Sequence, residues 1–198
     1  MGKGVPAALL GAAIKSYFLR ALSQLTASLD QRKLPEPEEI VTAVHIDVTR
    51  QFIGLESFVT LCYARFDLES RQVVFVDCGH TKTVHFQCRR GICETLRGKN
   101  IPLGFNEREI YRQVTVPVEA GDMFFFYSDG VTEAENAMGE FFGEDRLLEL
   151  IRAHGGLEPE ALIDKVRSAV VAFAQAETFA DDVTCVAVKI ADTSFSKV

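Results

Sequence analysis

Residues 122–134 read DMFFFYSDGVTEA, an aromatic run followed at once by a small acidic motif. Residues 123–127 are apolar at every position, whereas a strand with one face in water alternates apolar and polar residues. They therefore predict a central strand with both faces covered. The strand ends at Ser128-Asp129-Gly130, so a carboxylate is expected at the rim of a packed core.

The patterns on either side of this strand predict an α+β fold. Helical periodicity predicts helices at residues 6–29, 37–51, 144–153 and 159–176. β-branched and aromatic runs predict strands at residues 58–66, 72–78, 83–87, 92–96, 110–116, 122–127 and 183–190. Because the helices are grouped before and after runs of strands, the sheets should be mostly antiparallel. A single domain is expected over residues 1–190, with a loose tail at 191–198.

The composition is that of a globular chain with an acidic balance. The 198 residues are 47% hydrophobic and include 28 acidic and 21 basic side chains, for a net charge of -7. This charge excludes a sequence-independent nucleic-acid binder, which needs a basic surface. The apolar stretch at residues 4–14 has about half of the ~20 residues that a spanning helix needs, so no membrane insertion is expected.

Cysteine usage predicts reduced thiols and a cytoplasmic location. The five cysteines are odd in number and show no C-x-x-C spacing. Cys62, Cys78 and Cys185 lie in strand-like apolar runs, where a free thiol packs as a small hydrophobe. Cys88 and Cys93 could pair across a turn, although nothing requires it.

Two acidic motifs are candidate sites, and each has a simpler interpretation. Asp129-Gly130 follows a rigid strand, where glycine lets the backbone turn or approach an ion closely, but Asp-Gly is also a strong hairpin-turn signal. Asp181 and Asp182 repel one another unless a cation compensates, and Mg²⁺ or Mn²⁺ would do so. An acidic loop or a helix cap would also account for this pair.

Other catalytic patterns are weaker. Ser57 and Ser128 lack the G-x-S-x-G context of a serine hydrolase. No zinc-like spacing relates the four histidines, which are His45, His80, His85 and His154.

Taken in order, several short motifs resemble the metal-dependent protein serine/threonine phosphatases (PPM family), in their bacterial SpoIIE/RsbU-like branch. The match runs from Gly2 to about Ile190. The motifs are Gly2-Lys3-Gly4-Val5-Pro6-Ala7-Ala8-Leu9, Phe58-Val59-Thr60-Leu61, Cys78-Gly79-His80, Pro102-Leu103-Gly104, Gly121-Asp122, Tyr127-Ser128-Asp129-Gly130-Val131-Thr132-Glu133-Ala134, Phe142-Gly143 and Asp181-Asp182-Val183-Thr184.

This resemblance implies an α-β-β-α sandwich with a pair of Mn²⁺ or Mg²⁺ ions between two sheets. By motif position, Asp129 and Asp181 would be the catalytic metal ligands, in a site that also includes Gly130. Asp182 matches the neighbouring position, which in the family is usually a weaker or indirect ligand. Paired divalent ions activate a water that attacks phosphorus, so no covalent enzyme intermediate is required.

The chain departs from the family pattern at its beginning. In the family, a Gly-Asp whose carboxylate bridges both metals comes shortly before Gly-Lys-Gly, whereas here only Met1 precedes Gly2. The sequence is therefore expected to be an N-terminally incomplete domain with weak or no activity. A sheet edge exposed in this way, or the front helix, could support a homodimer.

The resemblance implies a phosphorylated protein substrate, namely an anti-sigma-factor antagonist in a bacterial partner-switching pathway. The alternative is a non-catalytic pseudophosphatase that binds a phosphoprotein or regulator without hydrolysing it. Activity of the extended chain would separate these two functions.

Overall fold

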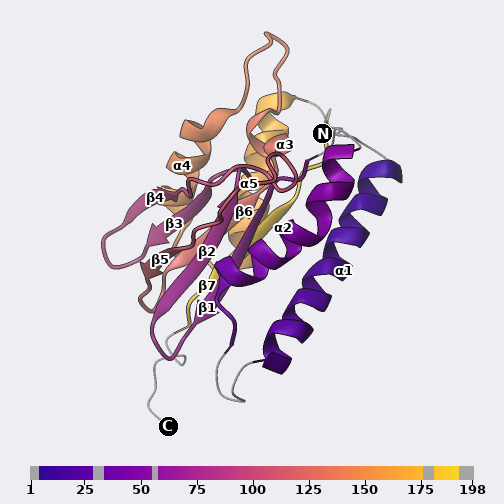
Figure 1. Cartoon of the computed structure of the whole chain (residues 1–198). Helices are drawn as coiled ribbons and strands as arrows, with labels where there is room; N and C mark the ends of the chain where they lie inside the picture. The colour runs from indigo at the N-terminus through magenta and orange to yellow at the C-terminus, as the bar shows by residue number, and fades with distance from the viewer. Residues whose placement is uncertain (1–4, 29–33, 55–57, 176–180, 192–198) are drawn as a thin grey trace. The chain divides into compact units, whose positions relative to one another are not determined.

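The computed structural model describes residues 5–28, 34–54, 58–175 and 181–191 (Figure 1). The chain divides into two compact units, Met1–His80 with Gly98–Pro117 and Thr81–Arg97 with Val118–Val198. Each unit consists of a helix pair and an antiparallel sheet around its own apolar core. The single domain over residues 1–190 stays a prediction. Within the described ranges, no helix combines the length and apolarity needed to cross a bilayer.

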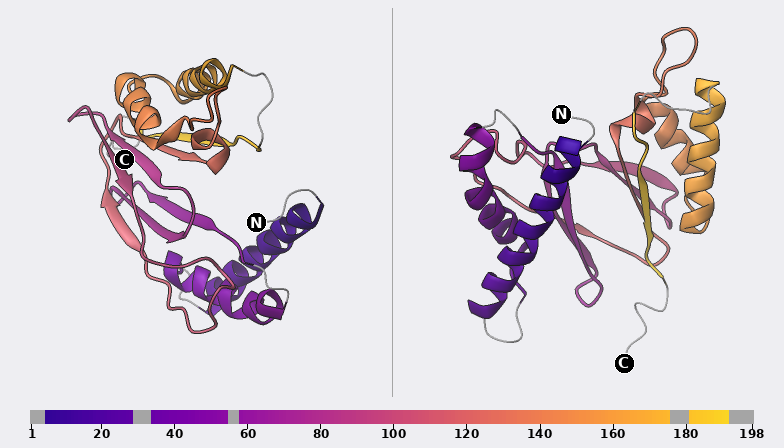
Figure 2. Two further views of the ribbon diagram at one scale, coloured as in Figure 1. Left: turned by 90° about the horizontal axis from the view of Figure 1, so that it is seen from above. Right: turned by 90° about the vertical axis from the view of Figure 1, so that its right-hand side faces the viewer.

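The first unit contains α1 (Val5–Ser28), α2 (Pro37–Gly54) and a sheet in the order β1-β2-β5. Strands β1 (Leu61–Asp67) and β5 (Val114–Pro117) both pair antiparallel with β2 (Gln72–Cys78). Helix α2 packs on β1 and β2, and α1 packs along α2 (Figure 2). The core face of α2 is formed by side chains at helical spacing that are fully buried, namely Val41, Val44 and Val48.

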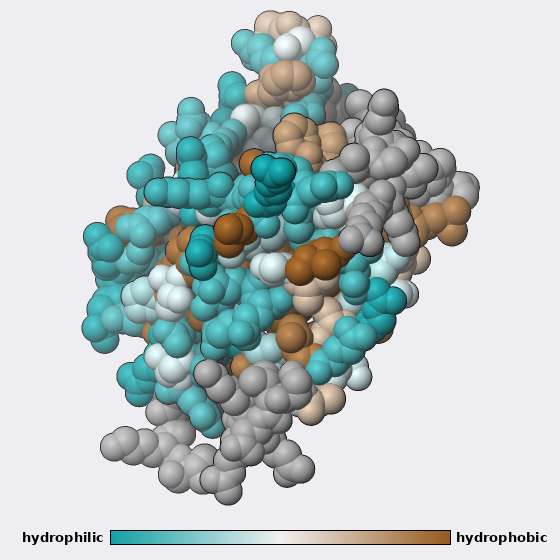
Figure 3. Space-filling view, viewed as in Figure 1, coloured by the Kyte–Doolittle hydropathy of each residue, from teal (hydrophilic) through white to brown (hydrophobic). Residues whose placement is uncertain are grey.

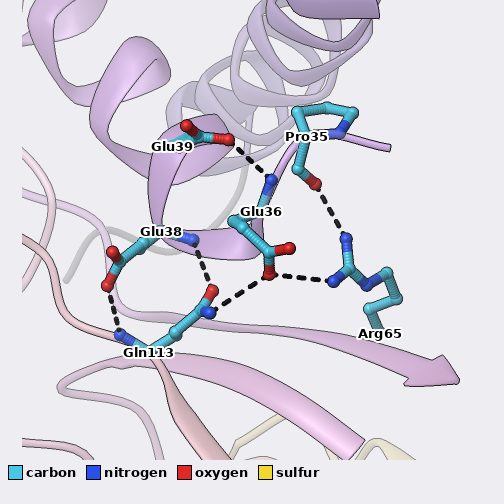
Figure 4. Close-up of polar contacts among 6 residues, drawn as sticks. All are labelled: Pro35, Glu36, Glu38, Glu39, Arg65 and Gln113. Atoms are coloured by element: carbon cyan, nitrogen blue, oxygen red, sulfur yellow. Dashed lines mark hydrogen bonds and ion pairs between the residues drawn. The ribbon is translucent and has the colours of Figure 1, made fainter. Parts of the chain in front are cut away.

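The predicted strand at residues 110–116 is wrong in its first half, because side chains take the hydrogen bonds of this backbone. Asn100 contacts the backbone of Arg112 twice, accepting from its N at 2.8 Å and donating to its O at 3.0 Å. The Gln113 amide donates to the Glu38 carboxylate at 3.1 Å, and its side-chain oxygen accepts from the Glu38 amide at 3.3 Å (Figure 4). Pairing with β2 therefore begins only in β5.

The second unit contains α4 (Gly143–His154), α5 (Pro159–Ala174) and a sheet in the order β4-β3-β6-β7. Its strands, all antiparallel to their neighbours, are β3 (Thr83–Gln87), β4 (Ile92–Leu96), β6 (Met123–Tyr127) and β7 (Cys185–Lys189). Helices α4 and α5 cover one face of this sheet (Figure 2). Because β6 lies between β3 and β7 and is almost wholly buried, the predicted central strand is confirmed.

A buried polar pair joins β3 to the beginning of β6. His85 Nε2 lies 2.9 Å from Asp122 Oδ2, and the imidazole stacks on Phe124 with ring centroids 4.3 Å apart. The Asp122 carboxylate also accepts from the amides of Cys88 and Glu119, each at 3.0 Å. Burial alone would raise the pKa of Asp122, but these hydrogen bonds outweigh it and lower that pKa.

The remaining predicted elements differ from the structure only at their ends. Several predictions fall outside the described residues, namely the helix ends at 29 and 176, Gly2 to Gly4, Ser57 and the tail at 192–198. On the face drawn in Figure 3, hydrophilic residues make up most of the surface and leave smaller apolar areas between them. Large apolar side chains that are exposed include Phe105, Ile110, Met138 and Phe141.

Candidate functional site

The candidate site lies in the second unit, where β6 ends. Ser128 is still extended, with φ -84° and ψ 159°, and Asp129 begins the short helix α3 (Asp129–Thr132). Two backbone bonds close this turn, from Val131 N to Ser128 O at 3.1 Å and from Glu133 N to Asp129 O at 2.8 Å. The simpler interpretation of Asp129-Gly130 as a hairpin turn is therefore wrong, because the backbone winds into a helical turn instead.

The second acidic motif lies beside the first because β6 and β7 are antiparallel neighbours. The last residue pair of their ladder is Tyr127 with Cys185, and the backbone bond from Ser128 N to Thr184 O at 3.0 Å extends it. The residues just before β7, Asp181 and Asp182, consequently come next to the residues just after β6. Segments that lie 52 positions apart in sequence (181 minus 129) meet at one end of this sheet.

Gly130 is needed here for close contact between the two segments. A Cβ at this position would lie 2.5 Å from the Asp182 carbonyl oxygen and 3.4 Å from that of Asp181. Such a separation is well inside van der Waals contact, so only glycine fits without movement. Among the predicted site residues, the structure thus brings together the backbones of Asp129, Gly130, Asp181 and Asp182.

The carboxylates of Asp129 and Asp181 are each oriented by the next amide in the chain. Gly130 N donates to Asp129 Oδ1 at 3.1 Å, and Asp182 N donates to Asp181 Oδ1 at 2.8 Å. Both residues are half-buried, while Asp182 is exposed. One oxygen of each carboxylate is therefore held by the backbone next to it.

The donor chemistry of these residues fits a hard divalent cation. Carboxylate oxygens are the ligands that Mg²⁺ and Mn²⁺ prefer, and a nearby cation would offset the repulsion between the adjacent residues Asp181 and Asp182. Within the described part of the chain, no group of three or more His, Cys, Asp or Glu side chains is placed to hold a metal ion. The described residues thus fit the ion by chemistry and supply part of a donor set.

Residues that the sequence patterns missed surround this strand end. The Thr81 hydroxyl donates to the Tyr127 carbonyl, and Lys82 forms an ion pair with Glu144 at the beginning of α4. The Ser128 hydroxyl contacts both Asp182 and Thr184. Apart from the adjacency of Ser128 to Asp129, no signal in the sequence could have found these contacts, since they join distant segments.

Neither the nearby phenol nor two of the thiols is a ready nucleophile. Burial, assisted by the Glu144 carboxylate, raises the pKa of Tyr127 to about 12. Burial also raises the pKa of Cys93 and of Cys185 to about 11, so both thiols stay protonated near neutral pH. All five cysteines are free, and Cys88 and Cys93 are not joined.

Comparison of the sequence with known proteins identifies relatives among bacterial phosphatases. The family described as Stage II sporulation protein E (SpoIIE) matches residues 1–191. The phosphoserine phosphatase RsbU of Bacillus subtilis is 28% identical over 158 residues, which are 78% of this chain and 43% of RsbU. The chain thus spans less than half the length of that relative.

Comparison with solved structures identifies the fold. The SiaA-PP2C domain of Pseudomonas aeruginosa has a TM-score of 0.79 at 19% identity, over 96% of this chain and 72% of that one. The phosphatase domain of SpoIIE from Bacillus subtilis, presoaked with Mn, has a TM-score of 0.56 at 17% identity, over 90% of this chain and 74% of that domain's chain. These likenesses confirm the predicted fold class, a mixture of helices and antiparallel sheets of the PP2C type.

Proposed function

Because the chain belongs to the SpoIIE family of PP2C-type phosphatase domains, we propose that it hydrolyses phosphoserine or phosphothreonine on a protein, using Mn²⁺ or Mg²⁺. The observation that carries this proposal is the convergence of the Asp129 and Asp181 segments at the end of β6. Gly130 and Ser128 bring the two segments into backbone contact. The relative RsbU, a phosphoserine phosphatase, supports the reaction class.

In this proposal, Asp129 and Asp181 hold the cations and Asp182 assists them. Bound divalent ions would lower the pKa of a water and offset charge on the phosphoryl group. The amides of Gly130 and Asp182 each hold one oxygen of the preceding carboxylate, which fixes the direction in which the other oxygen lies. The protein's own part is therefore to orient acidic ligands on a rigid strand end.

Attack by water agrees with the state of four side chains of the same unit that could otherwise act as nucleophiles. Tyr127, Cys93 and Cys185 all have raised pKa values and remain neutral at physiological pH. The Ser128 hydroxyl is engaged in two hydrogen bonds. A covalent phosphoenzyme formed on any of these four groups would require breaking contacts or deprotonating a weak acid.

The substrate in this proposal is an anti-sigma-factor antagonist, phosphorylated on serine or threonine, in a cytoplasmic bacterial partner-switching pathway. The chain is further proposed to act as a homodimer. A second candidate function is a non-catalytic phosphoprotein-binding module. It is favoured by one observation, that the described residues form no cluster of three potential metal ligands.

The experiment that tests the proposal uses the chain extended at its N-terminus to include the family's Gly-Asp. It measures manganese-dependent phosphate release from p-nitrophenyl phosphate and from a phosphoserine peptide. Asp129→Asn and Asp181→Asn keep the side-chain shape and remove the charge. Each should lower kcat/KM by about 100-fold or more, since even partners that only orient a metal ligand are worth roughly 10–100-fold.

The matched control is Asp164→Asn, which changes an exposed aspartate of α5 whose partner is Arg167. It should leave turnover unchanged. Normal turnover by both site variants would show that the assignment of Asp129 and Asp181 is incorrect. Absence of turnover in the extended chain, with retained phosphopeptide binding, would favour the non-catalytic function.

A further inference from the structure

Ser128 makes four hydrogen bonds, two through its hydroxyl and two through its backbone. Its Oγ donates to the Asp182 carbonyl at 2.9 Å and accepts from the Thr184 amide, also at 2.9 Å. Its own amide donates to Thr184 O at 3.0 Å, and its carbonyl accepts from Val131 N at 3.1 Å. One residue thereby connects β6, α3 and the acidic segment that precedes β7.

The geometry of the β6–β7 ladder explains why the hydroxyl is used in this way. An antiparallel pair of residues normally exchanges two backbone bonds, N–H to O=C in each direction. Ser128 N donates to Thr184 O, but the return bond from Thr184 N goes to Ser128 Oγ. The hydroxyl takes the place of the Ser128 carbonyl, which has turned away to begin α3.

The common structural role of a serine at this position does not account for these contacts. Ser128 is the N-cap residue of α3, where a serine side chain usually accepts from an amide of the first helical turn. Here it makes no such bond. Its hydroxyl is instead directed to the other chain segment, which carries Asp181 and Asp182.

We infer that Ser128 is a positioning residue for the cation site, and this inference rests on the proposed function. The hydroxyl holds the Asp182 backbone against the strand end that carries Asp129, while Gly130 permits the close approach. Ligand groups must be held within about 0.5 Å for productive binding. Without the hydroxyl, the segment that follows β6 loses its side-chain hydrogen bond to the segment that precedes β7. The distance between Asp129 and Asp181 is then less fixed.

The test compares two β-branched replacements, Ser128→Thr and Ser128→Val. Both suit the extended backbone of Ser128, and they differ from each other in one group, a hydroxyl against a methyl. Mn²⁺ affinity of the full chain is measured from the electron paramagnetic resonance signal of free Mn²⁺. We expect Ser128→Val to bind Mn²⁺ roughly 10–100-fold more weakly, and Ser128→Thr to restore the affinity of the parent chain.

Two further measurements distinguish positioning from general loss of structure. Hydrogen exchange should accelerate at the Thr184 amide in Ser128→Val, because that amide loses its acceptor. Ser128→Ala removes the same hydroxyl without added bulk, so it should repeat the weaker affinity if the valine variant does not fold.

The outcomes separate this inference from the function on which it rests. If Ser128→Val and Ser128→Ala bind Mn²⁺ as tightly as Ser128→Thr, while Asp129→Asn abolishes binding, the inference is wrong and the proposed function stands. If the parent chain binds no Mn²⁺, the proposed metal chemistry fails, and the role of Ser128 fails with it.

Discussion

Replacement of Gly130 by alanine tests the close contact at the end of β6. The added Cβ would lie 2.5 Å from the Asp182 carbonyl oxygen and 3.1 Å from its carbonyl carbon. Both are backbone atoms, so rotation of a side chain cannot relieve the overlap. Ordinary contact requires the 181–182 backbone and α3 to separate by about 1 Å.

The expected cost follows from two opposing effects. Overpacking of this kind destabilises a protein by about 1–3 kcal/mol, whereas replacing a helical glycine with alanine stabilises the helix by about 0.5–1 kcal/mol. The net loss should be about 1–2 kcal/mol in the free energy of unfolding. For a chain of this size that loss corresponds to a fall in melting temperature of about 3–6 °C.

The assay is thermal unfolding with and without Mn²⁺, using Gly11→Ala as the matched control. Gly11 is also helical, but a Cβ there meets nothing within 4 Å. Gly11→Ala should therefore raise stability by about 0.5–1 kcal/mol, while Gly130→Ala lowers it and weakens Mn²⁺ binding. A Gly130→Ala chain as stable as the parent, with unchanged Mn²⁺ affinity, would refute the reasoning.

Two other predictions concern buried or bridging carboxylates. Because the pKa of Asp122 is lowered in the folded state, this group contributes stability above its unfolded pKa near 3.8, and the contribution is lost as pH falls through the folded value. Urea unfolding of Asp122→Asn should thus show lower stability at pH 7 and a weaker acid dependence below pH ~4, and an unchanged acid profile would contradict the assignment. Asp77→Ala should cost about 2 kcal/mol in urea unfolding, because the amides of His80 and Gly98 lose their acceptor at 3.1 and 3.0 Å. The exposed control Glu69→Ala should change stability by less than about 0.5 kcal/mol, and an equal effect of both substitutions would show that the Asp77 bonds contribute little.

The central strand and the helices were predictable because their signals are local. A run that is apolar at every position requires burial on both faces, and β6 has it. The valines of α2 recur at helical spacing and form one buried face. Local hydrophobic patterns therefore predict both the central strand and the buried face of α2.

The errors have a common cause in contacts between distant residues. Apolar content at residues 110–113 favoured a strand, but Asn100 and Glu38 hold this backbone away from the sheet. The Asp129-Gly130 pair favoured a hairpin turn, but the Ser128 and Asp129 carbonyls accept bonds that begin a helical turn. The secondary-structure propensity of a segment gives no information about where such distant partners lie.

The sequence predicts the acidic residues of the candidate site, and it does not predict the contacts that support them. Ordered motifs point to Asp129 and Asp181, whose role as metal ligands stays a prediction, and the β6–β7 pairing brings their segments together. The Ser128 hydroxyl and the Thr81 hydroxyl act across the fold, so their roles depend on distances that a sequence does not express.

The central claim is that Asp129 and Asp181 bind the same cation site, and a double-mutant cycle on Mn²⁺ affinity tests it most directly. Isothermal titration would compare the parent chain with Asp129→Asn, Asp181→Asn and the double variant. If the two carboxylates share a site, each single change removes most of the affinity and the second adds little, so the effects are strongly non-additive. Independent, additive losses, or affinity retained by the double variant, would contradict the claim.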